Sequence, residues 1–456
     1  MQCFTVYCAK IENRLDPSFY VSLNTKMTGL VEIGKIAKIQ GGFAFKSNEY
    51  TEKGIPLVRI QNIVDSEIDL SDTVFIDKKN KDELLRFLLT EDDILIAMTG
   101  ATIGKVGRIN KDKLPAFLNQ RVGRFIIKSD EIKKNYFYYI LQLPFFQQQV
   151  KRFSLGGAQP NISPSSIETI KIPLPSVKIQ NCIVDLMQYA YEQKKQKEAE
   201  AQKLLDSIDD YVLNELGIKL PELKDKKCYA VNSSDIKERL DPYYYQPKFK
   251  ELYKMISSYK NTRLLKDVVN ELDYGLMPTQ DYALSEKEGI PMIRVTNILQ
   301  NGNIDMSDIK YIPFNTPRLD LKRVKENDIL MVQCGSTTGK IAIVPKKYEN
   351  YTFGSFSFVI RGKKEIANQY YLWAILFNRL AQEQIRHTWN IVTVRPNTSK
   401  PNIENLLIPI PSMASQNKIA EEVKRRMTRA EQLKAEARKI LEQAKQKVEE
   451  IILGKK

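Results

Sequence analysis

The chain has 456 residues, of which 70 are lysine or arginine and 55 are aspartate or glutamate, giving a formal net charge of +15. Apolar residues make up 43% and charged residues 27%, a balance that excludes intrinsic disorder and indicates a globular protein of two to four domains. The excess of cations favours a polyanionic partner, without separating DNA, RNA and anionic lipid. The five cysteines lack the spacing of a disulfide framework or a zinc site, and no apolar run is long enough to span a bilayer. We therefore expect a cytoplasmic protein.

The first 176 residues predict one globular domain of mixed α/β (α+β) type. Runs rich in apolar and β-branched residues, at 57–60, 94–98 and 123–127, predict strands, and the stretch 136–150 predicts a helix. The Ile-Pro-x-Pro-Ser motif that ends this part cannot continue a regular element, so we place the domain boundary at residues 1–176.

A long helix is predicted over residues 177–216. Apolar or small residues recur there in steps of three and four, and the segment has no internal proline or glycine. This spacing is close to the 3.5-residue period of a helix–helix seam, although polar residues interrupt it around 193–197. Gly217 and Pro221 end the helix, and a linker, residues 217–237, follows.

The second half of the chain repeats the first. The 15 residues from Asp93 match those from Asp328 at seven positions, and the stretch from Gly54 matches the stretch from Gly289 at the same spacing of 235 residues. The motifs Arg-Leu-Asp-Pro and Ile-Pro-x-Pro-Ser also occur once in each half, in the same order. These matches predict a tandem duplication.

The duplication predicts the organisation of the second half. We expect a second globular domain at residues 238–412 and a second long helix at 413–454, packed on the first helix. Between the shared blocks the two copies diverge strongly. A shared frame with divergent loops indicates one scaffold that carries two different surfaces.

Two glycine-rich turns invite comparison with a phosphate-binding loop. They run from Gly100 to Lys105 and from Gly335 to Lys340. Each has three residues between its glycines rather than four, and neither has the Ser or Thr after the lysine that would bind magnesium. Residues typical of a strand follow, instead of a helix N-terminus that would hold a phosphate. We expect no nucleotide binding, although each lysine can still contact a DNA phosphate.

Other catalytic patterns are incomplete. The segments that begin at Asp16 and Asp241 resemble the Asp-Pro-Pro-Tyr box of amino-group methyltransferases, but both lack the second proline, and no glycine-rich cofactor loop precedes them. The only histidine, His387, cannot form a two-histidine metal site, and we interpret it as a surface or packing residue. We therefore predict a chain without catalytic residues, and without a cofactor or metal of its own.

Basic and polar residues near the repeated turns remain as candidates for binding nucleic acid. Arg, Asn and Gln can read guanine or adenine edges in the major groove, while Lys typically contacts phosphates. Gln159 and Arg395 are the leading candidates for base readers. The candidate DNA contacts are Lys46, Lys105, Arg108, Arg121, Arg124, Lys151, Arg152, Gln159, Asn161, Lys340, Arg386, Arg395 and Asn397.

The order of these blocks, present twice, resembles the specificity subunit of type I restriction-modification enzymes. The resemblance rests on Arg-Leu-Asp-Pro, Gly-Ile-Pro-x-x-Arg, Asp-Ile-Leu before a Gly-x-Thr-x-Gly-Lys turn, and Ile-Pro-x-Pro-Ser before a long helix. It covers almost the whole chain. It implies two homologous target recognition domains, each reading one half of a bipartite site in double-stranded DNA. The domains would be separated by two long spacer helices that form an antiparallel coiled coil, in a pseudo-two-fold internal repeat.

The same resemblance implies the partners. Two methylation subunits would bind the chain and form an adenine methyltransferase that uses S-adenosylmethionine. Restriction subunits would add cleavage that depends on ATP and magnesium. All catalytic residues and cofactors would then belong to the partner subunits, and no membrane would be involved.

Three alternatives remain open from the sequence. The chain could serve a related type IIB-like system with a fused cleavage and methylation partner. It could be a coiled-coil scaffold for proteins, which would need no basic loops and would bind DNA with little sequence preference. It could also be a general nucleic-acid-binding or RNA-binding protein, although no RRM or KH signature is visible.

Overall fold

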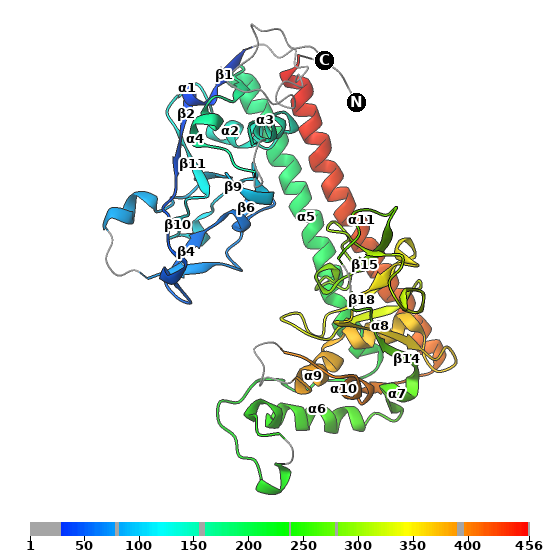
Figure 1. Cartoon of the computed structure of the whole chain (residues 1–456). Helices are drawn as coiled ribbons and strands as arrows, with labels where there is room; N and C mark the ends of the chain where they lie inside the picture. The colour runs from blue at the N-terminus through cyan, green and yellow to red at the C-terminus, as the bar shows by residue number, and fades with distance from the viewer. Residues whose placement is uncertain are drawn as a thin grey trace. The chain divides into compact units, whose positions relative to one another are not determined.

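The computed structural model describes residues 29–77, 82–154, 160–236, 239–278, 281–389 and 396–454. The chain divides into two units (Figure 1): unit 1 comprises Met1–Gln196 with Glu436–Lys456, and unit 2 comprises Lys197–Ala435. Each unit combines sheets with helices, which confirms the predicted mixed α/β class. Within the described ranges, no helix is both long and apolar enough to cross a bilayer.

Unit 1 is built on a six-stranded sheet. Its strand β8 (Ile94–Ala97) is buried at every position, as expected for an apolar strand inside a sheet. It pairs antiparallel with β11 (Val122–Ile127) on one side and with β9 (Val106–Arg108) on the other. The same sheet contains β2 (Ala37–Gly41), β6 (Glu67–Ile68) and β5 (Ile63–Val64), and a four-stranded sheet contains β10 (Phe117–Leu118), β4 (Ile55–Val58), β7 (Val74–Ile76) and β3 (Tyr50–Thr51).

Helices and a two-stranded sheet complete unit 1. Strand β1 (Leu30–Glu32) pairs antiparallel with β12 (Lys171–Pro173), which ties the start of the described chain to the end of the globular part. The predicted helical stretch 136–150 forms two helices, because a turn at residues 141–143 separates them. The helices are α1 (Ile33–Ile36), α2 (Lys134–Ile140), α3 (Pro144–Ser154) and α4 (Pro164–Glu168).

Unit 2 repeats the arrangement of unit 1 with fewer strands. Its largest sheet has four strands in the order β14–β20–β17–β18, its second sheet has the order β16–β15–β19, and β13 pairs with β21. Its strands are β13 (Thr262–Leu264), β14 (Val269–Tyr274), β15 (Gly289–Ile293), β16 (Lys310–Pro313), β17 (Ile329–Val332), β18 (Ile341–Ile343), β19 (Thr352–Phe353), β20 (Ser357–Gly362) and β21 (Leu407–Pro409). Its helices are α6 (Pro247–Ser257), α7 (Leu265–Val268), α8 (Gln369–Phe377), α9 (Arg379–His387) and α10 (Lys400–Glu404).

The strand orders confirm the internal repeat. The order β14–β20–β17–β18 in unit 2 corresponds to β2–β11–β8–β9 in unit 1, and β16–β15–β19 corresponds to β7–β4–β10. Individual side-chain hydrogen bonds also occur at equivalent positions of the two units. The Tyr136 hydroxyl donates to the Pro173 carbonyl at 2.8 Å, and the Tyr371 hydroxyl donates to the Pro409 carbonyl at 2.5 Å.

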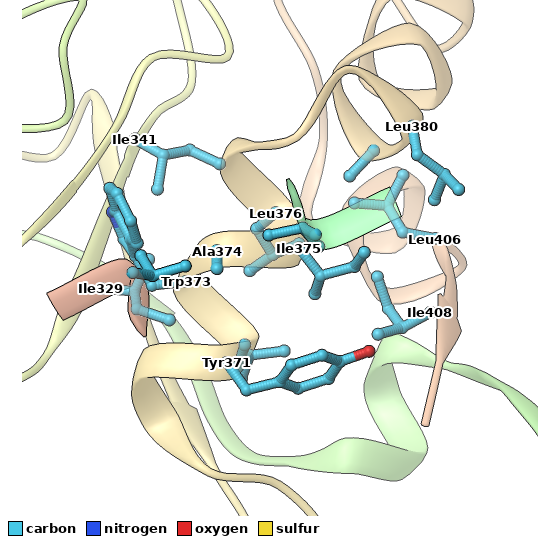
Figure 2. Packing of buried hydrophobic residues seen from close by; sticks show 14 of the residues in the cluster. Ile329, Ile341, Tyr371, Trp373, Ala374, Ile375, Leu376, Leu380, Leu406 and Ile408 are labelled. Carbon is cyan, nitrogen blue, oxygen red and sulfur yellow. The ribbon is translucent and has the colours of Figure 1, made fainter. Parts of the chain in front are cut away.

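The core of unit 2 is centred on α8, which is apolar around most of its circumference. Such a helix has to be buried on all sides, and Trp373 at its middle is fully buried. Figure 2 shows Trp373 beside Ile329 and Ile341 of the sheet, while Leu376 points toward Leu406 on the other side of the helix. The helix therefore packs between the sheet and the segment that leads to β21.

The two predicted long helices are α5 (Val177–Glu215) and α11 (Met413–Ile452). In unit 2, Lys418 of α11 donates to Glu215 at 2.7 Å, and Arg426 donates to the Ser207 carbonyl at 2.8 Å. The residue number rises along one helix as it falls along the other, so the helices are antiparallel in unit 2.

The last part of α11 also belongs to the core of unit 1. Ala444 and Val448 pack in the same buried cluster as Ile183, Met187 and Ala190 of α5. Each unit therefore contains a portion of both helices, and the core of unit 1 combines two separate stretches of chain.

Candidate nucleic-acid interface

Three loops meet at the carboxyl end of β8 in unit 1. The first is the glycine-rich turn, residues 100–105. The second is the turn 119–121 between β10 and β11, and the third is the loop 160–163 that precedes α4. We call these three loops, together with their counterparts in unit 2, the loop triad.

Backbone hydrogen bonds join the loop triad of unit 1. The Met98 N–H donates to the Arg121 carbonyl at 2.9 Å, and the Met98 carbonyl accepts from the Ile162 N–H at 3.0 Å. The Gly100 N–H donates to the Pro160 carbonyl at 2.9 Å. The main chain, rather than any variable side chain, therefore fixes the relative positions of the loops.

The loop triad of unit 2 has the same hydrogen bonds. The Gln333 N–H donates to the Phe356 carbonyl at 2.8 Å, the Thr398 N–H donates to the Gln333 carbonyl at 3.1 Å, and the Gly335 N–H donates to the Pro396 carbonyl at 3.0 Å. Its loops are residues 335–340, 354–356 and 396–399. One frame thus occurs twice with different side chains on it.

Glycine is required in the turn by backbone conformation and by close packing. Gly100 and Gly104 have φ of 77° and 82°, in the left-handed region that favours glycine. A Cβ on Gly104 would lie 2.8 Å from Gln147 Oε1 and 3.0 Å from Val150 Cγ1, because α3 lies directly against the turn. The Gln147 amide donates to the Gly104 carbonyl at 2.8 Å, so the glycine allows α3 to approach the loop triad.

The lysines of the two glycine-rich turns remain candidates for phosphate contacts. Lys105 is exposed and Lys340 is half-buried, and neither ammonium group has a hydrogen-bond or ion-pair partner among the described residues. Strands β9 and β18 follow the two turns, so neither turn carries the helix N-terminus of a nucleotide-binding loop. Lys46, Arg121, Lys151 and Asn161 are also exposed in unit 1, and Asn397 is half-buried in unit 2.

Arg124 needs correction, because its guanidinium group is used inside unit 1. It donates to the Leu88 carbonyl at 2.9 Å, to Asp93 Oδ2 at 3.0 Å and to Gln40 Oε1 at 2.6 Å, and its side chain is only 13% exposed. Arg361 binds Asp328 in the same way in unit 2. Arg124 therefore holds the sheet together, and we do not retain it among the candidate DNA contacts.

Three further arginines are partly engaged within the protein. Arg108 donates to Asn135 at 2.9 Å and lies over the Tyr138 ring at 4.8 Å. Arg386 forms an ion pair with Glu383, one turn earlier in α9. Arg152 is half-buried near the end of α3. A contact with DNA by these residues would compete with packing that already exists.

The two leading candidates for base readers, Gln159 and Arg395, lie outside the described residues. They directly precede Pro160 and Pro396 of the loop triads. The first Arg-Leu-Asp-Pro motif, from Arg14, also lies outside the described residues.

The second Arg-Leu-Asp-Pro motif holds the end of α9 in place. Arg239 donates to Asp241 at 2.8 Å and to the Trp389 carbonyl at 2.6 Å. His387 stacks on Tyr244 with 4.2 Å between the ring centroids, which bears out its interpretation as a packing residue. These contacts fix the C-terminal end of α9 and the two residues that follow it.

Phe356 was not among the residues predicted from the sequence, although it lies in the loop triad of unit 2 with 54% of its surface exposed. Only the repeat reveals it, because Phe356 lies 235 positions after Arg121. A search for basic and polar residues does not select a phenylalanine.

The fold and the loop triads define an internally duplicated protein with two binding surfaces on one frame. A family model described as "Type I restriction modification DNA specificity domain" matches residues 28–205 and again residues 258–443. The chain belongs to this family.

Known relatives agree with this family. The chain is 29% identical over 189 residues to the type I restriction enzyme MjaVIII specificity subunit of Methanocaldococcus jannaschii, a match that covers 39% of this chain and 44% of the relative. It is 22% identical to the type I restriction enzyme EcoBI specificity subunit of Escherichia coli, over 90% of this chain and 81% of the relative. A crystal structure of the type I restriction-modification S subunit from M. genitalium matches with a TM-score of 0.42 and 15% identity, over 97% of this chain and 98% of that one.

Proposed function

We propose that this chain is the DNA specificity subunit of a type I restriction-modification enzyme, in which unit 1 reads one half of a bipartite DNA target and unit 2 reads the other. The main observation in support of this proposal is the structure of the two loop triads. Their hydrogen-bonded frame is the same in both units, while the exposed side chains on it differ. Two half-sites of different sequence require such an arrangement, because backbone contacts position a domain and side chains specify bases.

The proposal extends to the organisation of the chain and its partners. Residues 1–176 and 238–412 act as target recognition domains, residues 177–216 and 413–454 act as spacer helices, and residues 217–237 link the two copies. The chain docks two methylation subunits and, through them, restriction subunits. It contributes no catalytic residue, and S-adenosylmethionine, ATP and magnesium act in the partners. Membership of the specificity family supports this division, and the complex works in the cytoplasm, where its DNA is.

Removal of either turn lysine tests the DNA interface. We expect Lys105→Ala and Lys340→Ala each to weaken binding to all DNA sequences by a similar factor, because a lysine on a phosphate carries no base information. Each variant should also lower the slope of log K against log salt by about one unit. The measurement is equilibrium binding of the complex with its methylation subunits, at several salt concentrations, to cognate and scrambled duplexes.

Lys111→Ala provides the matched control. Lys111 is an exposed lysine of unit 1 that follows β9, at the opposite end of the strands from the loop triad. Its removal should leave the affinity and the salt slope unchanged. Equal effects of all three substitutions would place the interface elsewhere. Failure of the wild-type complex to prefer any DNA sequence would favour the alternative of a protein scaffold.

A further inference from the structure

The loop triad places two chemically different side chains at one position of the repeated frame. The Arg121 carbonyl accepts from Met98 in unit 1, and the Phe356 carbonyl accepts from Gln333 in unit 2, at 2.9 and 2.8 Å. Both residues directly precede a strand, β11 or β20, that pairs with the central strand of its sheet. The backbone is therefore the same at this position, and the side chain alone distinguishes the two units.

Both side chains are available to a ligand. Arg121 is exposed, and its guanidinium group has no hydrogen-bond or ion-pair partner in the part of the chain that the structure describes. Phe356 is 54% exposed. Leaving an aromatic side chain in water forgoes the stabilisation that burial would supply, and Phe356 is exposed beside a glycine-rich turn that carries a lysine.

At a second pair of equivalent positions, unit 2 again has a larger apolar side chain than unit 1. The Phe43 N–H in unit 1 and the Leu276 N–H in unit 2 donate to the Leu118 and Phe353 carbonyls at 2.9 and 2.8 Å. These carbonyls belong to the last residues of β10 and β19, directly before the loops 119–121 and 354–356. The next residue is Ala44 in unit 1 but Met277 in unit 2, and Met277 is 61% exposed. Unit 1 thus presents a cation with a small neighbour, whereas unit 2 presents two large apolar side chains.

We infer that this position specifies a base in each half-site: Arg121 reads a guanine, and Phe356 contacts the methyl group of a thymine. This inference rests on the proposed function. Arginine forms two hydrogen bonds with the O6 and N7 atoms of guanine in the major groove, a pattern that no other base offers there. Phenylalanine can form no such bond, but it can pack on the thymine methyl group, which is the apolar feature of that groove.

Exchange of the two side chains tests the inference. Phe356→Arg should replace a thymine preference by a guanine preference at one position of one half-site, and the other half-site should not change. Arg121→Phe should cost roughly 5- to 150-fold in discrimination at one guanine of the other half-site. The readout is selection of bound duplexes from a randomised pool by the complex with its methylation subunits, which also reports overall affinity.

Two further comparisons test whether Phe356 makes an apolar contact with the thymine methyl group. Phe356→Leu keeps an apolar side chain and should retain the thymine preference. Replacing the specified thymine by deoxyuracil, which lacks only the methyl group, should weaken binding of the wild-type complex and leave Phe356→Arg unaffected. Leu321→Ala, an exposed leucine outside the loop triad, is the control for loss of apolar surface and should bind as the wild type does.

The outcomes separate this inference from the function on which it rests. If the exchanged variants lose affinity equally for all sequences while the wild type stays specific, Arg121 and Phe356 do not read bases, and the inference is overturned with the proposed function intact. An undiminished affinity for the deoxyuracil duplex would overturn the contact with thymine. A wild-type complex that selects no sequence would overturn the proposed function itself.

Discussion

His387 is held as a neutral imidazole inside unit 2. Its Nε2 atom lies 3.0 Å from the Tyr244 carbonyl and its Nδ1 atom lies 3.1 Å from the Tyr253 hydroxyl. A carbonyl oxygen can only accept, so Nε2 carries the proton and Nδ1 accepts from the tyrosine. The pKa of His387 is lowered to about 4, chiefly because burial disfavours the charged form. The contact with the Tyr244 carbonyl and the charge of Asp241 oppose this shift, and the nearby Arg239 contributes to it.

The chain has a single histidine, so its titration can be followed without assignment. We expect the imidazole proton resonance to titrate with a midpoint near pH 4, instead of the 6.5 of a free histidine. The unfolded state takes up a proton below about pH 6.5, while the folded state does so only near pH 4. The free energy of unfolding should therefore fall as the pH drops through this window, by about 1.4 kcal/mol for each pKa unit of displacement.

His387→Gln is the matched variant, because a glutamine can still donate a hydrogen bond but does not titrate. Its urea midpoint should depend less on pH between 6.5 and 4 than that of the wild type. A midpoint near pH 6.5 in the wild-type spectrum would contradict the buried position of the ring.

At the residue scale, the sequence located the two glycine-rich turns that carry Lys105 and Lys340, but not the role of Arg124. These turns are recognisable because two glycines precede each lysine and adopt the positive φ that fixes the turn locally. Arg124 donates to the Leu88 carbonyl, Asp93 and Gln40. These residues lie far from Arg124 in the sequence, so no local sequence pattern connects them to it. An arginine that binds a buried carboxylate and an arginine that faces DNA look the same in one sequence.

At the scale of elements, the long helices were the most predictable feature. Their seam period and the lack of internal proline and glycine predicted 177–216 and 413–454, and the structure has Val177–Glu215 and Met413–Ile452. The short strands were harder to predict, since β3, β5, β6 and β10 have only two residues each. Strands this short depend on pairing with distant partners, so their own sequence specifies them weakly.

The apolar helix–helix seam predicted from the sequence is interrupted around residues 193–197, and α5 is also less buried there. None of the residues 191–200 is fully buried, and the division between the units falls at Gln196. We expect this stretch to tolerate insertion. Adding seven residues after Gln196 in α5 and seven after Ala435 in α11 adds about two turns to each helix and keeps the period of the seam.

If the helices are spacers, this double insertion should change the length of the unspecified gap in the DNA target, by up to about three base pairs given roughly 10 Å of added helix. The bases of the two specified blocks should stay the same. Sequencing of methylated sites in cells that carry the altered complex measures both properties. Insertion into α5 alone is the control and should abolish binding, because it displaces the helix pairing. A change in the bases themselves would refute the role of the helices as spacers.

At the scale of the whole molecule, the repeat predicts that the units read DNA independently. Replacing residues 238–412 by the corresponding domain of another family member should change one half of the methylated sequence and leave the other half as it was. The reciprocal exchange of residues 1–176 should change only the other half. Simultaneous change of both halves after either exchange would contradict independent reading.

The division of α11 between the units also sets an order of events during synthesis. Ile183 and Met187 are synthesised early, but their core in unit 1 is completed by Ala444 and Val448, which are synthesised much later. Contacts across so many residues carry a high entropic cost of loop closure and form slowly. All of unit 2 precedes Ala444 and Val448 in the sequence, so it can fold while the apolar residues of α5 in unit 1 still lack these two partners.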